Sequence, residues 1–162
     1  VDGYFVRGDW TVQGQLSYGY QKDAAITANA NGGLQTASWY GLSTLAAYKF
    51  TPRFEGIGRF DYVNNGRNGG GLLGYGMDDG NGIGPNGNLG CEQGAAAVDP
   101  GCNDGASRYA LSLGLNYVFN QYTMFKAEYR YDWANQPVFL YVDDGSYRKN
   151  NSVLGASVVV SF

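Results

Sequence analysis

Apolar and polar residues alternate along most of this chain with the period of two that is typical of β-strands. In residues 10–20 the even positions are Trp, Val, Gly, Leu, Tyr and Tyr, whereas the odd positions are Thr, Gln, Gln, Ser and Gly. Turn residues follow most of these alternating segments. The pattern predicts strands over 10–20, 38–50, 54–63, 108–119, 123–133 and 152–162, and the end of a strand over 1–6. We therefore expect one all-β domain over 1–162.

The connections between these strands are alternately short and long. Short turns lie at 7–9, 51–53 and 120–122, and long segments lie at 21–37, 64–106 and 134–150. The last of these contains Asp143, Asp144 and Gly145, which are typical of a hairpin turn. The alternation predicts an antiparallel up-and-down sheet, with the short periplasmic turns and long extracellular loops of outer-membrane β-barrels.

A soluble sheet would also alternate, so the distribution of aromatic residues decides between the two environments. On the apolar face an aliphatic band lies between two aromatic belts. The belt near the short turns contains Trp10, Tyr48, Phe50, Phe54, Tyr117, Phe119, Phe125 and Phe162, and the belt near the long loops contains Tyr18, Tyr20, Tyr40, Phe60, Tyr62, Tyr109, Tyr131 and Trp133. Two such belts match the two lipid–water interfaces of a membrane. The strands also fit a tilted membrane crossing of about 9–11 residues.

The charged residues of the strands all fall on the face without the aromatic belts. Those predicted to line a pore are Glu55, Arg59, Asp61, Arg108, Lys126, Glu128, Arg130 and Asp132. Opposed charges across a lumen would create a field that orients and filters small polar solutes. Alternatively, these side chains pair with one another along neighbouring strands and hold the wall rigid.

The composition argues against several other functions. The chain has no His, which excludes Ser-His-Asp and Cys-His catalysis and every His-ligated metal site. A formal charge of −3 and the lack of a basic stripe give no support for nucleic-acid binding. An enzyme would need a carboxylate pair such as Asp78 and Asp79, and nothing places that pair in a defined site. We therefore expect no enzymatic activity, no cofactor and no metal.

Two features of the segment 64–106 leave alternatives open. Cys91 and Cys102 are expected to form a disulfide that closes a small loop, which implies an oxidising compartment, and the alternative is a pair of free loop thiols. Residues 77–84 have the spaced Asp and Asn oxygens of a Ca²⁺ loop but lack its distal Glu. This loop is either a surface loop or one that folds into the mouth of a barrel and constricts it.

Three segments carry a resemblance to a known family. PRFEGIGRFDYVNNGRNGGG at 52–71, RYALSLGLNYVFNQYTMFKAEYRYDWANQPVF at 108–139 and NNSVLGASVVVSF at 150–162 resemble the OmpL-like β-barrel porins of betaproteobacteria. This resemblance implies a porin in the outer membrane of a Gram-negative bacterium, which passes small hydrophilic solutes and assembles as a homotrimer. The apolar last strand and its terminal Phe162 resemble the signal read by the barrel-assembly machinery. The expected partners are thus outer-membrane lipid, that machinery and small solutes.

The number of strands sets the expected size of the barrel. Single-chain bacterial barrels normally have an even number of strands, whereas the pattern predicts seven here. We therefore expect the C-terminal portion of a larger barrel of roughly 16–18 strands, which leaves an aqueous channel. The alternative is a complete eight-stranded barrel with one more strand in 21–37 or 72–90, which conducts poorly. The competing function is a structural or surface-interaction barrel, for adhesion or as a sheath for a partner, without conductance.

Overall fold

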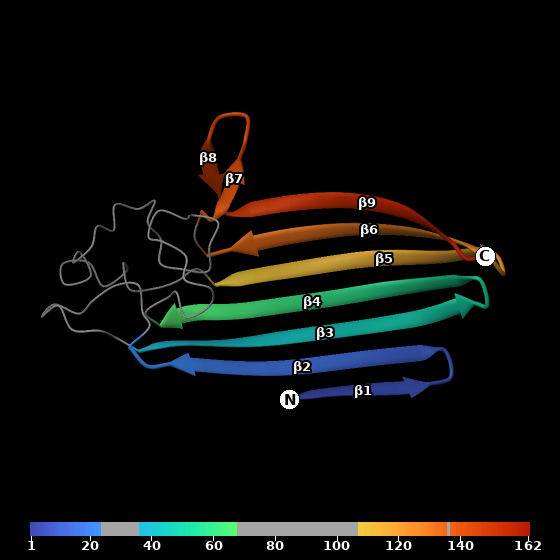
Figure 1. Ribbon diagram of the computed structural model, residues 1–162, viewed down its shortest axis with the longest axis horizontal. Helices are drawn as coiled ribbons and strands as arrows, with labels where there is room; N and C mark the ends of the chain where they lie inside the picture. The colour runs from blue at the N-terminus through green and yellow to red at the C-terminus, as the bar shows by residue number, and fades with distance from the viewer. Residues whose placement is uncertain (24–35, 68–106, 136) are drawn as a thin grey trace, which may run out of the picture.

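A computed structural model describes residues 1–23, 36–67, 107–135 and 137–162 (Figure 1). Seven strands form one antiparallel sheet in the order β1-β2-β3-β4-β5-β6-β9, and β7 pairs with β8 in a separate two-stranded sheet. Their bounds are β1 (Asp2–Arg7), β2 (Trp10–Gln21), β3 (Ala37–Thr51), β4 (Phe54–Arg67), β5 (Arg108–Asn120), β6 (Thr123–Ala134), β7 (Phe139–Tyr141), β8 (Ser146–Arg148) and β9 (Asn150–Val160). The prediction of an all-β, antiparallel up-and-down sheet is confirmed. The described part of the chain holds no helix of the length and apolarity that a membrane crossing requires.

The short turns are built from the residues that turn chemistry requires. Gly8 joins β1 to β2 with a φ of 58°, a left-handed conformation that a side chain would oppose. Between β3 and β4 the Thr51 hydroxyl accepts hydrogen bonds from the backbone N–H groups of Arg53 (3.3 Å) and Phe54 (3.0 Å). Between β5 and β6 the Asn120 side chain accepts one from the Tyr122 N–H (2.8 Å). These turns lie together at one end of the sheet (Figure 1).

The strand register keeps the two faces of the sheet chemically separate. Leu42 of β3 lies opposite Leu16 of β2 and Tyr62 of β4, whereas Arg59 lies opposite Ser112 of β5. Because side chains opposite one another share a face, a single shift of register would exchange the faces. The separation predicted within each strand is therefore maintained across the whole sheet. We call the face with Leu42 the apolar face and the face with Arg59 the polar face.

The last strand begins and ends earlier than the sequence predicts. We expected residues 152–162, and β9 covers Asn150–Val160. Val160 lies opposite Thr123, the first residue of β6, and the Ser161 N–H donates to the Tyr122 carbonyl at 2.8 Å. The segment before β6 turns away at that point, so Phe162 lies beyond β9 and is fully exposed. Phe162 was expected in the aromatic belt near the short turns, but it lies two residues beyond the end of β9.

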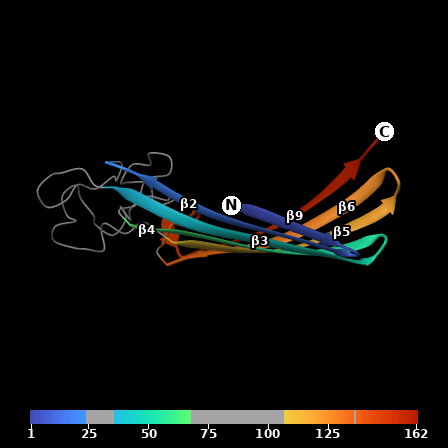
Figure 2. The same ribbon diagram turned by 90° about the horizontal axis from the view of Figure 1, so that it is seen from below.

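The sheet is a single curved layer (Figure 2), and its described residues form no core of large side chains. The buried apolar residues of the described part are all of modest size: Ala37, Ala47, Ala110, Ala134 and Val138. Large residues at the centre of the apolar face are open, with Leu113 56% exposed and Leu154 79% exposed. Strands β1 and β9 form the two edges of the sheet, and they do not pair with each other. Within the described residues, nothing covers the apolar face.

Candidate functional site

The structure brings all eight predicted pore-lining residues to the polar face. Glu55, Arg59 and Asp61 come from β4, Arg108 comes from β5, and Lys126, Glu128, Arg130 and Asp132 come from β6. Their cross-strand neighbours include Asn116, Ser112, Ala110 and Gly114, which are polar or small. The charges therefore gather on three adjacent strands of the sheet.

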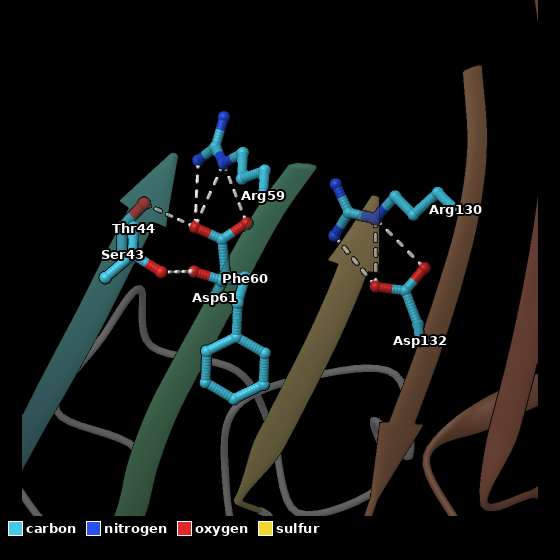
Figure 3. A network of polar contacts seen from close by, with 7 residues as sticks. All are labelled: Ser43, Thr44, Arg59, Phe60, Asp61, Arg130 and Asp132. Carbon is cyan, nitrogen blue, oxygen red and sulfur yellow. Dashed lines mark hydrogen bonds and ion pairs between the residues drawn. The ribbon is translucent and has the colours of Figure 1, made fainter. Parts of the chain in front are cut away.

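Arg59 and Asp61 form an ion pair within β4. The Arg59 Nε atom lies 2.8 Å from Asp61 Oδ2, and Nε and Nη2 donate to Oδ1 at 3.1 Å and 3.0 Å. Ser43 of β3 adds a hydrogen bond of 2.6 Å from its hydroxyl to the same Oδ1 (Figure 3). Asp61 is thus held from two strands, and it fixes the position of the Arg59 guanidinium group.

Arg130 and Asp132 repeat this arrangement within β6. Arg130 Nη2 donates to Asp132 Oδ1 at 2.8 Å, and Nε donates to both carboxylate oxygens at 3.0 Å and 3.1 Å (Figure 3). In both pairs the guanidinium side is the more exposed. The side chain of Arg130 is 48% exposed and that of Asp132 is 14%, and the values for Arg59 and Asp61 are 52% and 23%. Both cations therefore face the open side of the sheet.

The ion pairs run along the strands, whereas the sequence suggested pairing between neighbouring strands. The register explains the difference. Arg59 and Arg130 lie in one row with Ser112 between them, and Asp61 and Asp132 lie in the next row with Ala110 between them. No acidic residue lies directly opposite either arginine, so each pairs with the aspartate two residues further along its own strand. Ala110 and Ser112 are buried between the two pairs.

The remaining charges have different surroundings. The Asn116 side-chain amide donates to Glu55 Oε2 at 2.8 Å, and Lys126 lies opposite Asn116 on the other side. Glu128 lies between Gly114 and Gly155. The Arg108 guanidinium group lies 5.6 Å from the centre of the Phe139 ring, in cation–π contact.

Two of the hollows on the polar face lie on either side of Arg59. One has a volume of about 290 Å³ and lies over β5, with Arg59, Ser112, Gly114 and Arg130 among its lining residues. The other has a volume of about 500 Å³ and lies nearer β1, with Gln13, Gln15 and Ser43 among its lining residues. The first hollow is bordered by charged groups of β4 and β6, and the second is bordered mainly by neutral polar groups.

On the apolar face the rings near the long connections form a continuous row. Tyr62 contacts Tyr40 at 6.0 Å and stacks on Tyr109 at 4.7 Å between ring centres. Tyr109 stacks in turn on Trp133 at 5.2 Å, and Trp133 also contacts Phe60 and Tyr131. Tyr18 lies beside Tyr40 in the register, and Tyr20 lies opposite Ser38. The row therefore crosses from β2 to β6.

A second row lies near the short turns. Trp10, Tyr48, Phe50 and Phe54 contact one another in sequence, with ring centres 4.7 Å, 5.1 Å and 5.8 Å apart. Phe119 and Phe125 form a further pair at 6.0 Å. Tyr117 lies opposite both Phe54 and Phe125 in the register and links the two groups. Between the two rows lie aliphatic residues such as Leu42, Leu113 and Leu115.

A protein-family model matches residues 1–162 of the sequence. The chain belongs to the DUF3138 family. The description of that family is a protein of unknown function. No curated protein and no solved structure matches the chain. The function is therefore inferred from the geometry of the two faces.

Several residues of the polar face were not predicted from the sequence. Ser43, Ser112 and Asn116 hold or separate the charged groups, but polar residues of this kind occur at many strand positions. Leu45 and Ile57 border the hollow over β5. The sequence does mark these two, because they are large apolar residues at polar-face positions of their strands. Phe139 was assigned to a loop, and its contact with Arg108 depends on the fold of the segment after β6.

Some predictions fall outside the residues that the structure describes. These are the disulfide between Cys91 and Cys102, the loop at 77–84 with its Asp78 and Asp79, and the idea that the segment 64–106 constricts a pore. Among the described residues, no group of three or more His, Cys, Asp or Glu is placed to hold a metal ion.

Proposed function

We propose that this DUF3138 chain forms part of the wall of a β-barrel in the outer membrane of a Gram-negative bacterium. The barrel is a passive channel for small hydrophilic solutes. The observation that carries the proposal is the uncovered apolar face, which has aliphatic side chains at its centre and a row of aromatic rings at each end.

The apolar face suits lipid better than water. Soluble monomeric proteins rarely expose contiguous apolar patches of more than a few hundred Å². Here Leu16, Leu113, Leu154 and Val160 are all exposed, together with rings of both rows such as Tyr18, Tyr40, Trp10 and Phe50. In a membrane the aliphatic band would contact the hydrocarbon core, and the rings would lie at its two interfaces. Lipid would then cover the surface that a soluble sandwich covers with a second sheet.

The polar face suits a water-filled lumen. Arg or Lys facing lipid at mid-membrane costs about 2–4 kcal/mol, and the eight charged residues named above from β4, β5 and β6 all lie on the polar face. Both guanidinium groups remain about half exposed, so water is their natural surroundings. Charges on a pore wall create a field that acts on passing ions.

Further strands would close the barrel through β1 and β9. In lipid, every backbone N–H and C=O group must be paired, which an open sheet edge prevents. A large barrel also fits the polar face, because the small residues Ser112 and Gly114 border a hollow there. An eight-stranded barrel would instead fill its interior with side chains. We propose roughly 16–18 strands, which leave an aqueous channel. Trimer formation and recognition by the assembly machinery remain predictions from the resemblance.

The test is conductance of the full-length protein in a planar lipid bilayer. In KCl we expect stepwise current increases of uniform size, because each inserted channel opens one aqueous path. The same preparation, heat-denatured before addition, serves as the control. A folded, membrane-inserted protein that gives no steps would contradict the channel and favour a structural or surface-interaction barrel.

A further inference from the structure

We propose that the hollow over β5 binds a small organic carboxylate with a short apolar part. This inference rests on the proposed channel and names the class of solute that its wall recognises. We call the site the β5 hollow. Its lining has three cations, Arg59, Lys126 and Arg130, against one anion, Glu128, and is completed by Leu45, Ile57, Ser112, Gly114, Asn116 and Ala127.

Arg59 and Arg130 are the two guanidinium groups of the β5 hollow. Each guanidinium group uses Nε and Nη2 to bind its own aspartate. The third nitrogen of each group points away from that carboxylate (Figure 3). These nitrogens are strong donors, and guanidinium groups are well suited to carboxylates. Both arginines therefore retain a donor for an anion.

The two arginines border the same hollow. They lie in the same row on β4 and β6, whose backbones are two strand spacings or about 9.6 Å apart. Because both side chains line the hollow, a carboxylate there can accept a hydrogen bond of about 2.9 Å from each. Ser112 lies at the midpoint of the row and can donate its hydroxyl to the same group.

The two aspartates prepare the arginines for binding. Asp61 and Asp132 hold the guanidinium groups in place, and Ser43 holds Asp61 through a bond of 2.6 Å. A ligand therefore does not have to order two long side chains, which lowers the entropic cost of binding. The carboxylates are also the less exposed partners of each pair, so an incoming anion meets the guanidinium groups first.

The β5 hollow also has an apolar part. Leu45 and Ile57 are large hydrophobic residues among the charged groups of the polar face, and both border the cavity. Gly114 forms part of the floor, where a Cβ atom would contact the Ile57 Cβ at 3.5 Å. A hydrocarbon chain or ring can therefore lie against Ile57 while its carboxylate lies between the arginines. The volume of about 290 Å³ limits the ligand to a small molecule.

The experiment uses the full-length protein in detergent, with benzoate as the probe and titration calorimetry as the readout. We expect saturable binding of benzoate and no binding of benzamide, which has the same ring without the charge. Inorganic phosphate tests for the anion site alone, and we expect it to bind more weakly than benzoate.

Two charge-neutral double variants, R59Q/D61N and R130Q/D132N, test the residues. Each removes one guanidinium group without changing the net charge of the wall, and we expect benzoate binding to weaken at least about tenfold, as for the loss of a charged hydrogen bond. The control R53Q removes an arginine from the β3–β4 turn and should bind as wild type does. Far-UV circular dichroism of each variant shows that it is folded.

The outcomes separate this site from the proposed channel. Equal binding of benzoate and benzamide, phosphate binding as tight as benzoate binding, or wild-type affinity in both double variants would overturn the site. Because calorimetry requires no current, benzoate binding without KCl steps would support the site and overturn the channel. KCl steps without benzoate binding would support the channel and overturn the site. If the variants do not fold, the comparison of the three probes on the wild-type protein still decides.

Discussion

Two small residues of β5, Ala110 and Ser112, set the charge pattern of the polar face. They lie between Asp61 and Asp132 and between Arg59 and Arg130, respectively, and both are buried. A larger or charged residue at either position would contact both ion pairs and compete with the pairing along each strand. The strength of exposed ion pairs is small, so their main effect here is to orient the guanidinium groups.

The three tryptophans report which face meets lipid. Trp10 and Trp133 are on the apolar face, whereas Trp39 lies opposite Gly19 on the polar face. In vesicles of brominated lipid we expect strong quenching of single-Trp variants that keep Trp10 or Trp133, because bromine quenches only on contact. The variant that keeps Trp39 is the matched control and should retain most of its fluorescence. Equal quenching of all three would contradict the assignment of the faces.

The space above Gly19 is occupied by the indole of Trp39. A Cβ atom at Gly19 would overlap that ring, so G19A must displace a large side chain and should lower the free energy of unfolding by about 1–3 kcal/mol. G14A on the same strand is the control, because nothing lies within 4 Å of its new Cβ. It should be neutral or stabilising by up to about 1 kcal/mol. Urea unfolding of both variants of the full-length protein measures the difference, and equal effects would contradict the packing.

At the scale of elements, the β7–β8 hairpin differs from the rest of the molecule. It stands off the long sheet at the end opposite the short turns (Figure 1). Val138 and Phe139 pack with Ala134 at its base, and Phe139 also meets Arg108. The tip is closed by the Gly145 N–H, which donates to the Tyr141 carbonyl at 2.9 Å. The hairpin is therefore anchored at its base, next to the polar face.

The tip of this hairpin should respond to acid through Asp144. Hydrogen bonds from the Ser146 side chain and backbone N–H, and then the Arg148 charge, lower the pKa of Asp144 below its ordinary value. A lowered folded pKa means that the contribution of Asp144 is complete above its unfolded pKa of about 3.9 and is lost as the pH falls through the folded value. A ¹³C NMR titration of the carboxyl group should give a midpoint below about 3.9. The S146A variant should move it upward, and an unchanged midpoint there would contradict the cause.

At the scale of the whole molecule, the two edges of the sheet decide what the sheet can be. Each inner strand pairs on both sides, whereas β1 and β9 pair on one side only within the described residues. An open edge in water invites pairing with another chain, and an open edge in lipid leaves backbone groups without partners. Closure is therefore the physical requirement on which the proposed barrel depends.

Hydrogen exchange tests closure directly in the full-length protein. In a closed barrel the outward-facing amides of β1 and β9 are paired, so they should exchange as slowly as those of β4 and β5. In an open sheet these edge amides would exchange rapidly, while β4 and β5 would remain protected as internal controls. Mass-spectrometric exchange of the folded protein in detergent or nanodiscs distinguishes the two. Fast exchange confined to both edges would contradict the barrel.

The sequence by itself determined the two faces and the order of the strands. Alternation places Leu113 and Ser112 on opposite sides whatever the neighbours are, and short turns such as 120–122 leave adjacent strands no other way to pair. The pattern did not determine where β9 ends, because a strand ends where its partner does and Val160 lies opposite Thr123, the first residue of β6.

The tertiary structure alone decided which charges meet. Arg59 pairs along its strand because the register sets it opposite Ser112, and the hollow beside Ile57 exists because Gly114 lies opposite. Such pairings depend on residues far apart in the chain, and a periodic pattern carries no information about them.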